Sequence, residues 1–190
     1  MEMIRFYQGD PRHIQHFVKV HSFSRLIGQA EGLDEEQMYI LEAAALVHDI
    51  GIKIGMEKYG RSDGKVQELE GPAAAREMMT RLGFRENVIS RVEYLVGHHH
   101  TYKDIDGLDY QVLVEADFLV NYFEDDLDKK HIRKSAEKIF KTETGKKIVK
   151  EMFSRRLFRS RRHGRRMRCR IWRILLKSRG FTSDSNGAVR

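Results

Sequence analysis

Residues 40–51 read ILEAAALVHDIG, an apolar run that ends in a histidine, an aspartate and a glycine. The run predicts a buried helix, because apolar residues dominate more than two turns. Adjacent helical residues diverge by about 100°, so His48 and Asp49 can reach one ion only where the helix is ending, and Gly51 supplies that break. The alternative is an ordinary helix end at which His48 interacts with the helix dipole.

Helical periodicity extends over most of the chain, without strand alternation or an internal repeat. Asp10 and Pro11 predict the start of a first helix that ends near Gly32, and Asp34 with Gln37 predicts a capping box for the second. Further helices are expected at Pro72 to Leu82, Glu86 to His99, Asp109 to Phe123, Lys129 to Lys141 and Thr144 to Phe153. The sequence therefore predicts an all-α fold, a single-domain helical bundle of about six to seven helices.

Residues 51–70 contain Gly51, Gly55, Gly60 and Gly64 among mixed charges. This composition favours a long ordered loop. Loops of this length inside compact domains are uncommon unless they are functional, so the segment is a candidate lid or substrate loop.

Charge is distributed unevenly along the chain. Residues 155–190 hold 13 Lys and Arg and one acid, Asp184, whereas residues 1–154 hold 22 Lys and Arg and 27 Asp and Glu. We expect one domain at residues 1–154 and a basic Arg-rich tail at 155–190, interpreted as disordered or adventitious. The tail could alternatively bind nucleic acid or an anionic membrane, but the acidic body gives no reason to expect nucleic acid as a partner.

The chain carries no sign of secretion or of membrane insertion. Its single cysteine, Cys169, lies in the tail, so a disulfide framework is not expected. Residues 1–10 lack the basic and apolar regions of a secretory signal, and no stretch approaches the roughly 20 apolar residues of a spanning helix. We therefore expect a cytoplasmic protein without a membrane partner.

Other ligand-type residues lie on both sides of the His48-Asp49 pair. His16 lies on an apolar helix face, where a lone histidine is more often structural. Asp117 lies in the apolar run 112–120, so its carboxylate requires a cation, either a metal ion or an Arg or Lys. Two of His98-His99-His100 could face one ion at a fraying helix end, or the three could form a surface cluster. Glu115 could belong to the solvated face of its helix.

His16, the run His48-Asp49-Ile50-Gly51, and Asp117 after Glu115-Ala116 resemble the HD superfamily of metal-dependent phosphohydrolases. The resemblance covers roughly residues 10–153 and implies an all-helical scaffold. The segments Gly-Asp-Pro at 9–11, Gln-Glu-Leu-Glu-Gly-Pro at 67–72, Gly-His-His-His-Thr-Tyr at 97–102 and Thr-Gly-Lys-Lys at 144–147 are similar to a group of small bacterial HD proteins.

The resemblance implies four ligands of a first metal ion: His16, His48, Asp49 and Asp117. In binuclear HD enzymes a further histidine and a later His-His pair hold a second ion. Glu70 stands in the place of that histidine, and His98-His99 match the pair. Glutamate is a competent ligand for Fe or Mn. The expected cofactor is one or two divalent metal ions, drawn from Fe, Mn, Co, Ni, Mg and Zn.

The chain departs from the family pattern at two places. Ile52 stands where many HD enzymes carry lysine, with Lys53 one position later. Asp106-Gly107 is followed by Leu108-Asp109-Tyr110, without the Gly-Tyr-Pro of the cyclic-dinucleotide phosphodiesterases. The pattern of His100-Thr101 before Ala116-Asp117 is similar to bacterial dinucleoside tetraphosphate hydrolases.

The expected function is hydrolysis of a phosphate ester or anhydride, of a nucleotide or dinucleotide, by a metal-activated water. The expected catalytic residues are Asp49, which orients the water, His99 or His100, which protonates the leaving group, and Lys53, which binds phosphate. The expected substrate-binding residues are Lys65, Arg76 and His100. The alternative is a regulatory HD module that binds metal or nucleotide without turnover. The chain could form a homodimer.

Overall fold

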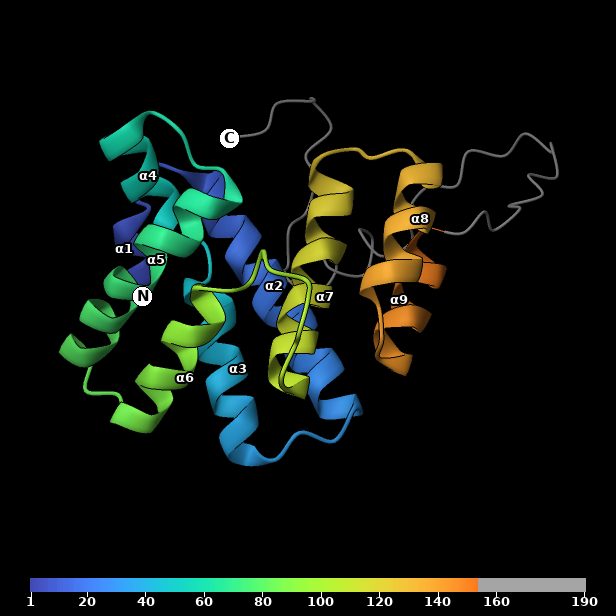
Figure 1. Cartoon of the computed structure of the whole chain (residues 1–190), viewed down its shortest axis with the longest axis horizontal. Helices are drawn as coiled ribbons and strands as arrows, with labels where there is room; N and C mark the ends of the chain where they lie inside the picture. The colour runs from blue at the N-terminus through green and yellow to red at the C-terminus, as the bar shows by residue number, and fades with distance from the viewer. Residues whose placement is uncertain (154–190) are drawn as a thin grey trace, which may run out of the picture. The chain divides into compact units, whose positions relative to one another are not determined.

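The computed structural model describes residues 1–153, which form nine α-helices and no strand (Figure 1). The helices are α1 (Glu2–Phe6), α2 (Pro11–Ala30), α3 (Glu35–Val47), α4 (Gly51–Tyr59), α5 (Gly64–Arg81), α6 (Glu86–Val96), α7 (Leu108–Glu124), α8 (Lys129–Ile139) and α9 (Glu143–Phe153). The all-α prediction is confirmed, but the described residues form nine helices rather than the expected six to seven, because α1 and α4 were not predicted. The expected tail at residues 155–190 lies outside the described residues, so the boundary at residue 154 stays a prediction.

The caps predicted for the first two long helices are both formed. The Asp10 carboxylate accepts a hydrogen bond from the backbone N–H of His13, with Pro11 in the first turn of α2. At α3, Asp34 accepts from the Gln37 N–H at 2.8 Å, while the Gln37 side chain accepts from the Asp34 N–H at 3.1 Å. These bonds satisfy N–H groups that have no partner inside the helix, which places both helix starts.

The prediction of a long loop at residues 51–70 is wrong, because α4 and the first two turns of α5 occupy all of it except residues 60–63. Two of its glycines permit close crossing of these helices. A Cβ atom on Gly51 would lie 2.7 Å from the Gln67 carbonyl oxygen of α5, and one on Gly55 would lie 2.5 Å from Val66 Cγ1 of α5. Gly60, with φ of +66°, ends α4 in the left-handed conformation. Composition alone does not separate a packing glycine from a loop glycine.

The prediction that Pro72 starts a helix is also wrong, because Pro72 lies inside α5. Proline lacks an N–H group and removes one backbone hydrogen bond, which normally favours the first turn. Here α5 packs against both α4 and α6, and Pro72 lies against Gly97 just after α6. This packing stabilises the continuous helix.

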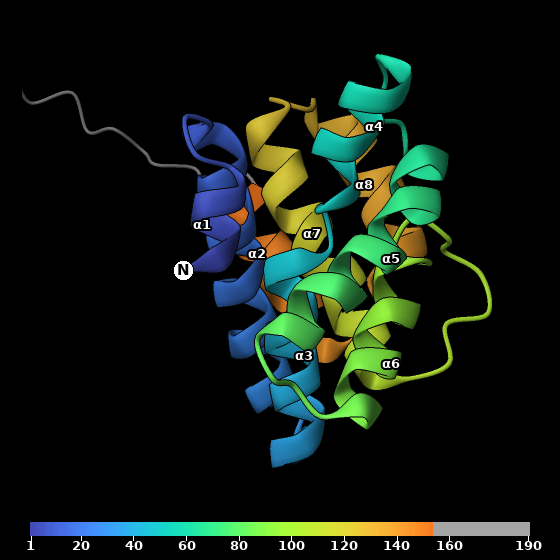
Figure 2. The ribbon, with the colours of Figure 1, turned by 90° about the vertical axis from the view of Figure 1, so that its left-hand side faces the viewer.

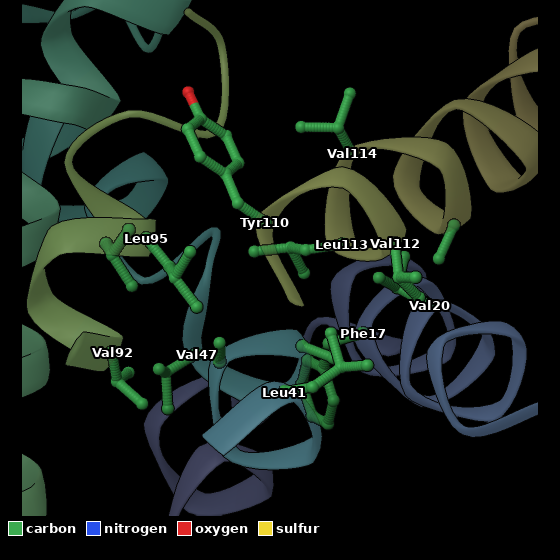
Figure 3. Close-up of a cluster of buried hydrophobic side chains, with 14 of the residues drawn as sticks. Phe17, Val20, Leu41, Val47, Val92, Leu95, Tyr110, Val112, Leu113 and Val114 are labelled. Atoms are coloured by element: carbon green, nitrogen blue, oxygen red, sulfur yellow. The ribbon is translucent and has the colours of Figure 1, made fainter. Parts of the chain in front are cut away.

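Helix α7 forms the centre of the bundle. Nearly every residue from Asp109 to Val120 is buried, which explains why residues 112–120 are mostly apolar. Helices α2, α3 and the α8–α9 pair pack against it, while α6 packs on α3 and α5 on α6 (Figure 2). Buried side chains of α2, α3, α6 and α7 meet in one core, including Phe17, Leu41, Val92 and Leu113 (Figure 3).

Glu115 does not lie on a solvated face, because its side chain is fully buried in α7. Its carboxylate accepts hydrogen bonds from the backbone N–H groups of Lys141 and Thr142, from the Thr142 hydroxyl and from Gln111 Nε2. These four donors satisfy the buried carboxylate and tie the segment between α8 and α9 to α7.

Among the described residues, no helix is long and apolar enough to cross a membrane.

The close crossing at Gly51 predicts a stability effect. Gly51→Ala should lower the free energy of unfolding by about 2 kcal/mol, because the added methyl group meets the backbone of α5. Urea denaturation measures the change. Glu57→Ala, at an exposed position of the same helix, should change it by less than about 0.5 kcal/mol. Equal stability of Gly51→Ala and the wild type would contradict the close packing of α4 on α5.

Candidate metal centre

Side chains from α2, α7 and the turn between α3 and α4 converge in the bundle. His16 lies in α2, Asp117 in α7, and His48-Asp49 in the turn that begins where α3 ends. His16 Nε2 lies 3.1 Å from Asp117 Oδ1, 3.3 Å from Asp49 Oδ2 and 3.3 Å from His48 Nε2. His16, His48 and Asp117 are buried, and the Asp49 side chain is 15% exposed. His48 and Asp49 thus lie at a helix end, where both side chains can turn toward His16.

The spacing of these atoms suits ligands of a single ion. His48 Nε2 lies 3.4 Å from Asp49 Oδ2 and 3.6 Å from Asp117 Oδ1. Nitrogen and oxygen ligands bind zinc at about 2.0–2.2 Å, which places neighbouring ligands about 3.0 Å apart around an octahedral ion and about 3.4 Å apart around a tetrahedral one. His16, His48 and Asp49 can therefore share one divalent ion. Asp117 Oδ1 lies close to both imidazoles, and a shift of its carboxylate toward Asp49 would let it join them.

The other ring nitrogen of each histidine holds the imidazole in place. His48 Nδ1 donates to the Ala45 carbonyl oxygen at 3.0 Å, and His16 Nδ1 donates to Glu124 Oε2 at 2.9 Å. With its proton on Nδ1, each ring presents the lone pair of Nε2 to the cluster. Histidine ligands of metal ions are commonly oriented by a carbonyl or carboxylate in this way.

A second group of potential ligands consists of Asp49, His99 and His100, whose ligand atoms lie within 4.8 Å of one another. His99 Nδ1 donates to the Val96 carbonyl oxygen at 2.8 Å, and His99 Nε2 lies 3.5 Å from Asp49 Oδ1. This Nε2 atom is buried and has no hydrogen-bond partner. A buried nitrogen without a partner is rare in proteins, and a metal ion or a hydrogen-bonded ligand would satisfy it. The residues present therefore fit a divalent metal centre.

The electrostatics of the cluster also favour a cation. Burial would lower the pKa values of His16 and His48, but hydrogen bonding to Asp117 raises the pKa of His16, and the charge of Asp49 raises the pKa of His48 well above its ordinary value. Burial would raise the pKa values of Asp49 and Asp117, but the imidazoles hold both below their usual range. Two ionised carboxylates in a buried site require positive charge, from protons on the histidines or from a metal ion.

A family model matches the part of the chain that contains this cluster. The model of the HD domain matches residues 14–171, which is well over half of the chain. The chain belongs to the HD domain family. HD proteins are generally metal-dependent phosphohydrolases, which fits the His and Asp cluster. No curated protein and no solved structure matches the chain.

Four side chains around the HD cluster were not identified from the sequence. Tyr7 donates to the Asp49 carbonyl oxygen at 2.7 Å, and Asn121 Nδ2 donates to Asp117 Oδ1 at 2.9 Å. Glu124 binds His16, and Glu68 accepts from the His100 N–H and the Thr101 hydroxyl. The helical spacing of Asn121 and Glu124 from Asp117 was a usable signal, because residues four and seven apart share a helix face. Tyr7 and Glu68 gave no such signal.

Two expected metal ligands do not join the cluster of this HD domain. The Glu70 carboxylate binds Lys58 Nζ and the Tyr59 hydroxyl. His98 stacks on Tyr94, with Nδ1 bonded to the Tyr94 carbonyl oxygen at 2.7 Å. The structure instead brings His100 beside His99 and Asp49. The turn after α6 decides which two of the three consecutive histidines face the centre.

The expected cationic residues also lie outside the cluster. Lys53 donates to the Phe6 carbonyl oxygen at 2.9 Å and lies over the Phe6 ring. The guanidinium of Arg76 is bound by Glu86 and Glu93. Lys65 is exposed in the first turn of α5, directly after Gly64, where an added Cβ atom would lie 2.9 Å from the His100 ring. Of these three side chains, Lys65 is the one that lies next to a residue, Gly64, in contact with His100.

His100 and Tyr102 form the outer side of the centre. Burial, followed by the charge of His99, lowers the pKa of His100 to about 4, so this imidazole is neutral at pH 7 and able to bind a metal ion. Burial, followed by the charge of Asp117, raises the pKa of Tyr102 to about 12, so its hydroxyl remains protonated. The two side chains are linked by a contact of 3.2 Å between His100 Nδ1 and the Tyr102 hydroxyl.

The raised pKa values of His16 and His48 predict how the stability of the metal-free protein depends on pH. Each imidazole binds its proton more tightly in the folded state. This contribution is complete below the unfolded pKa of about 6.5 and is lost as pH rises through the folded pKa. In the presence of a chelator, the free energy of unfolding should therefore decrease as pH rises above about 6.5.

Urea denaturation across this pH range measures the effect. His48→Gln removes one titrating group and should make the decrease shallower. An unchanged slope in this variant would show that the cluster does not cause the pH dependence.

Proposed function

We propose that this HD domain hydrolyses a phosphate ester or anhydride, of a nucleotide or dinucleotide, with a metal-activated water. One observation carries the proposal: the His16 and His48 Nε2 atoms each lie 3.1–3.6 Å from carboxylate oxygens of both Asp49 and Asp117. Family membership supports the class of reaction. We further propose that the substrate is a small phosphorylated molecule and that the protein acts in the cytoplasm.

We assign His16, His48, Asp49 and Asp117 as the ligands of one divalent ion, with Asp49, His99 and His100 available for a second. When bound, such an ion lowers the pKa of a coordinated water toward about 7 and offsets the negative charge of the phosphoryl oxygens. Mixed imidazole and carboxylate ligands suit Fe and Mn as well as Zn, Co and Ni, so the identity of the metal is left to measurement.

Asp49 is the side chain that connects the two groups of ligands. Its Oδ2 atom faces His16 and His48, while its Oδ1 atom faces His99. In the proposed reaction, this carboxylate accepts a hydrogen bond from the attacking water and orients it toward phosphorus. The hydrogen bond from Tyr7 to the Asp49 carbonyl oxygen holds the backbone at this position.

The role of His99 depends on the number of ions. One ring nitrogen, Nδ1, is bonded to the Val96 carbonyl oxygen, which leaves only Nε2 to face the centre. With one ion bound, Nε2 could donate a proton to the leaving group if the ring first takes up a second proton there, because the first proton stays on Nδ1. With two ions bound, the same atom is a ligand, and the proton must come from elsewhere.

Lys65 is the cationic side chain that we assign to the phosphoryl group, because it is exposed and follows Gly64 at the edge of the centre. The Lys53 ammonium would have to leave the Phe6 carbonyl oxygen to bind phosphate. Arg76 would have to leave two carboxylates. Breaking these existing contacts makes both residues weaker candidates than Lys65.

Replacement of Asp49 tests the centre. Asp49→Ala should abolish both metal binding and turnover, because it removes ligands on both sides and the group that orients water. Elemental analysis of protein purified without chelator measures the bound metal, and phosphate release from a panel of nucleotides with added Mn²⁺ measures turnover.

Glu70→Gln is the matched control, since Glu70 is bonded to Lys58 and Tyr59 and not to the cluster. It should retain the metal content of the wild type. Full activity of Asp49→Ala would exclude the proposed reaction, while bound metal without turnover of any phosphate ester by the wild type would favour a regulatory HD module.

The two outer histidines provide a second test. His100→Gln should lower kcat/KM by more than about tenfold, because His100 lies with Asp49 and His99. His98→Gln should change it by less than about twofold, because that ring stacks on Tyr94. Steady-state kinetics on the preferred substrate measures both variants, with circular dichroism as a check of folding. The reverse order of effects would restore His98 as the functional residue.

A further inference from the structure

The edge of the metal centre carries an aromatic side chain that the proposed reaction does not use. Tyr102 follows the turn of three histidines and is 41% exposed. Its hydroxyl lies 3.2 Å from His100 Nδ1, and His100 lies with Asp49 and His99 in the second group of potential ligands. Single exposed aromatic residues are common on protein surfaces, but this one adjoins a buried cluster of charged groups.

Phe118 supports the ring of Tyr102 from α7. It directly follows Asp117, and its ring centroid lies 5.1 Å from that of Tyr102 at an interplanar angle of 68°. Tyr122 packs against Phe118 in turn, at 5.6 Å. Because the rings of Tyr102 and Phe118 meet edge to face while Tyr102 stays partly exposed, the Tyr102 ring offers apolar surface beside the centre. We call Tyr102 and Phe118 the aromatic shelf.

The turn that carries Tyr102 is held on α5 by several hydrogen bonds. Glu68 accepts from the His100 N–H and from the Thr101 hydroxyl, both at 3.0 Å. His100 Nε2 lies 3.1 Å from Gln67 Oε1. Tyr110 donates its hydroxyl to the carbonyl oxygens of His98 and Thr101 from the other side. A ring held by such a turn loses little further freedom when a ligand binds to it.

The side chains of α5 that are bonded to the turn are neutral or acidic. Gln67 is uncharged, and Glu68 is a carboxylate. A carboxylate at this position repels a second phosphate, whereas an aromatic ring stacks on any planar π-system. The exposed face of the Tyr102 ring therefore suits an uncharged planar group, while Lys65 remains the candidate cation for the phosphate at the centre.

We propose that Tyr102, supported by Phe118, stacks on the nucleobase of a substrate whose phosphate lies at the metal centre. This inference rests on the proposed function, which places the substrate phosphate at the metal centre, and it adds how the base of the substrate is recognised. Tyr102 thereby makes the enzyme prefer a nucleoside phosphate over the corresponding sugar phosphate, which has the same phosphate group and sugar but no base.

The test compares the four common nucleoside 5′-monophosphates with ribose 5-phosphate, which lacks only the base. The wild type should show a higher kcat/KM for at least one nucleotide than for the sugar phosphate. Tyr102→Ala should lower this selectivity ratio by about tenfold, which is the loss expected from one base–aromatic stack. Tyr102→Phe keeps the ring and should keep the ratio within about twofold, which separates stacking from the contact with His100.

Tyr39→Ala is the matched control. Tyr39 is 48% exposed and stacks on Phe84 at 5.7 Å, but it lies near the start of α3, away from the centre. This variant should leave the selectivity ratio unchanged. An unchanged ratio in Tyr102→Ala, or a wild type without preference for any nucleotide over ribose 5-phosphate, would overturn the inference.

Saturation-transfer NMR with unphosphorylated nucleosides makes the test independent of turnover. The signal of the base protons should appear with the wild type and with Tyr39→Ala, and be lost with Tyr102→Ala. If the protein binds nucleosides through Tyr102 but hydrolyses no phosphate ester, the stacking role of Tyr102 is supported and the proposed function is rejected. If the protein hydrolyses phosphate esters without preferring nucleotides, the stacking role of Tyr102 is rejected and the proposed function is supported.

Discussion

The arrangement of this protein depends on two carboxylates, Asp49 and Asp117, that remain ionised inside a helical bundle. Removing a carboxylate from water costs several kcal/mol unless positive charge or hydrogen-bond donors compensate. His16 and His48 supply that compensation, and each imidazole lies within 3.6 Å of oxygens from both carboxylates. The same groups that stabilise the carboxylates in the absence of metal are those that can hold a divalent ion.

The surrounding helices hold this cluster through few but well-placed contacts. Glu124 and the Ala45 carbonyl oxygen orient the two imidazoles, and Asn121 binds Asp117. Glu115, only two residues before Asp117, ties the α8–α9 segment to the same helix. Helix α7 therefore contributes both a candidate ligand and a buried anchor, and its burial on nearly all sides limits movement of either. A rigid scaffold of this kind is what precise placement of ligands requires.

Some parts of the site followed from local rules. The apolar run before His48-Asp49 and the break after it placed the pair at a helix end, and the unpaired charge within residues 112–120 marked Asp117 as a residue in need of a cation. Other parts did not follow. Resemblance suggested Glu70 as a ligand, but positions 68 and 70 of a helix point about 200° apart, and the phase of α5 turns Glu68 toward the histidine turn. The order of residues in the sequence does not indicate how α5 is rotated about its axis.

By itself, the sequence determined the helical class, the caps of α2 and α3, and the four residues that converge on the candidate centre, because these depend on periodicity, local hydrogen bonding and a resemblance spread over the chain. Only the tertiary structure decided that most of residues 51–70 are helical, that His100 lies beside His99, and that Tyr102 and Phe118 adjoin the centre. These features depend on how closely helices cross and how each is rotated about its axis. Packing between segments far apart in the sequence determines the distance between helices and their rotation, so a local sequence pattern cannot predict either.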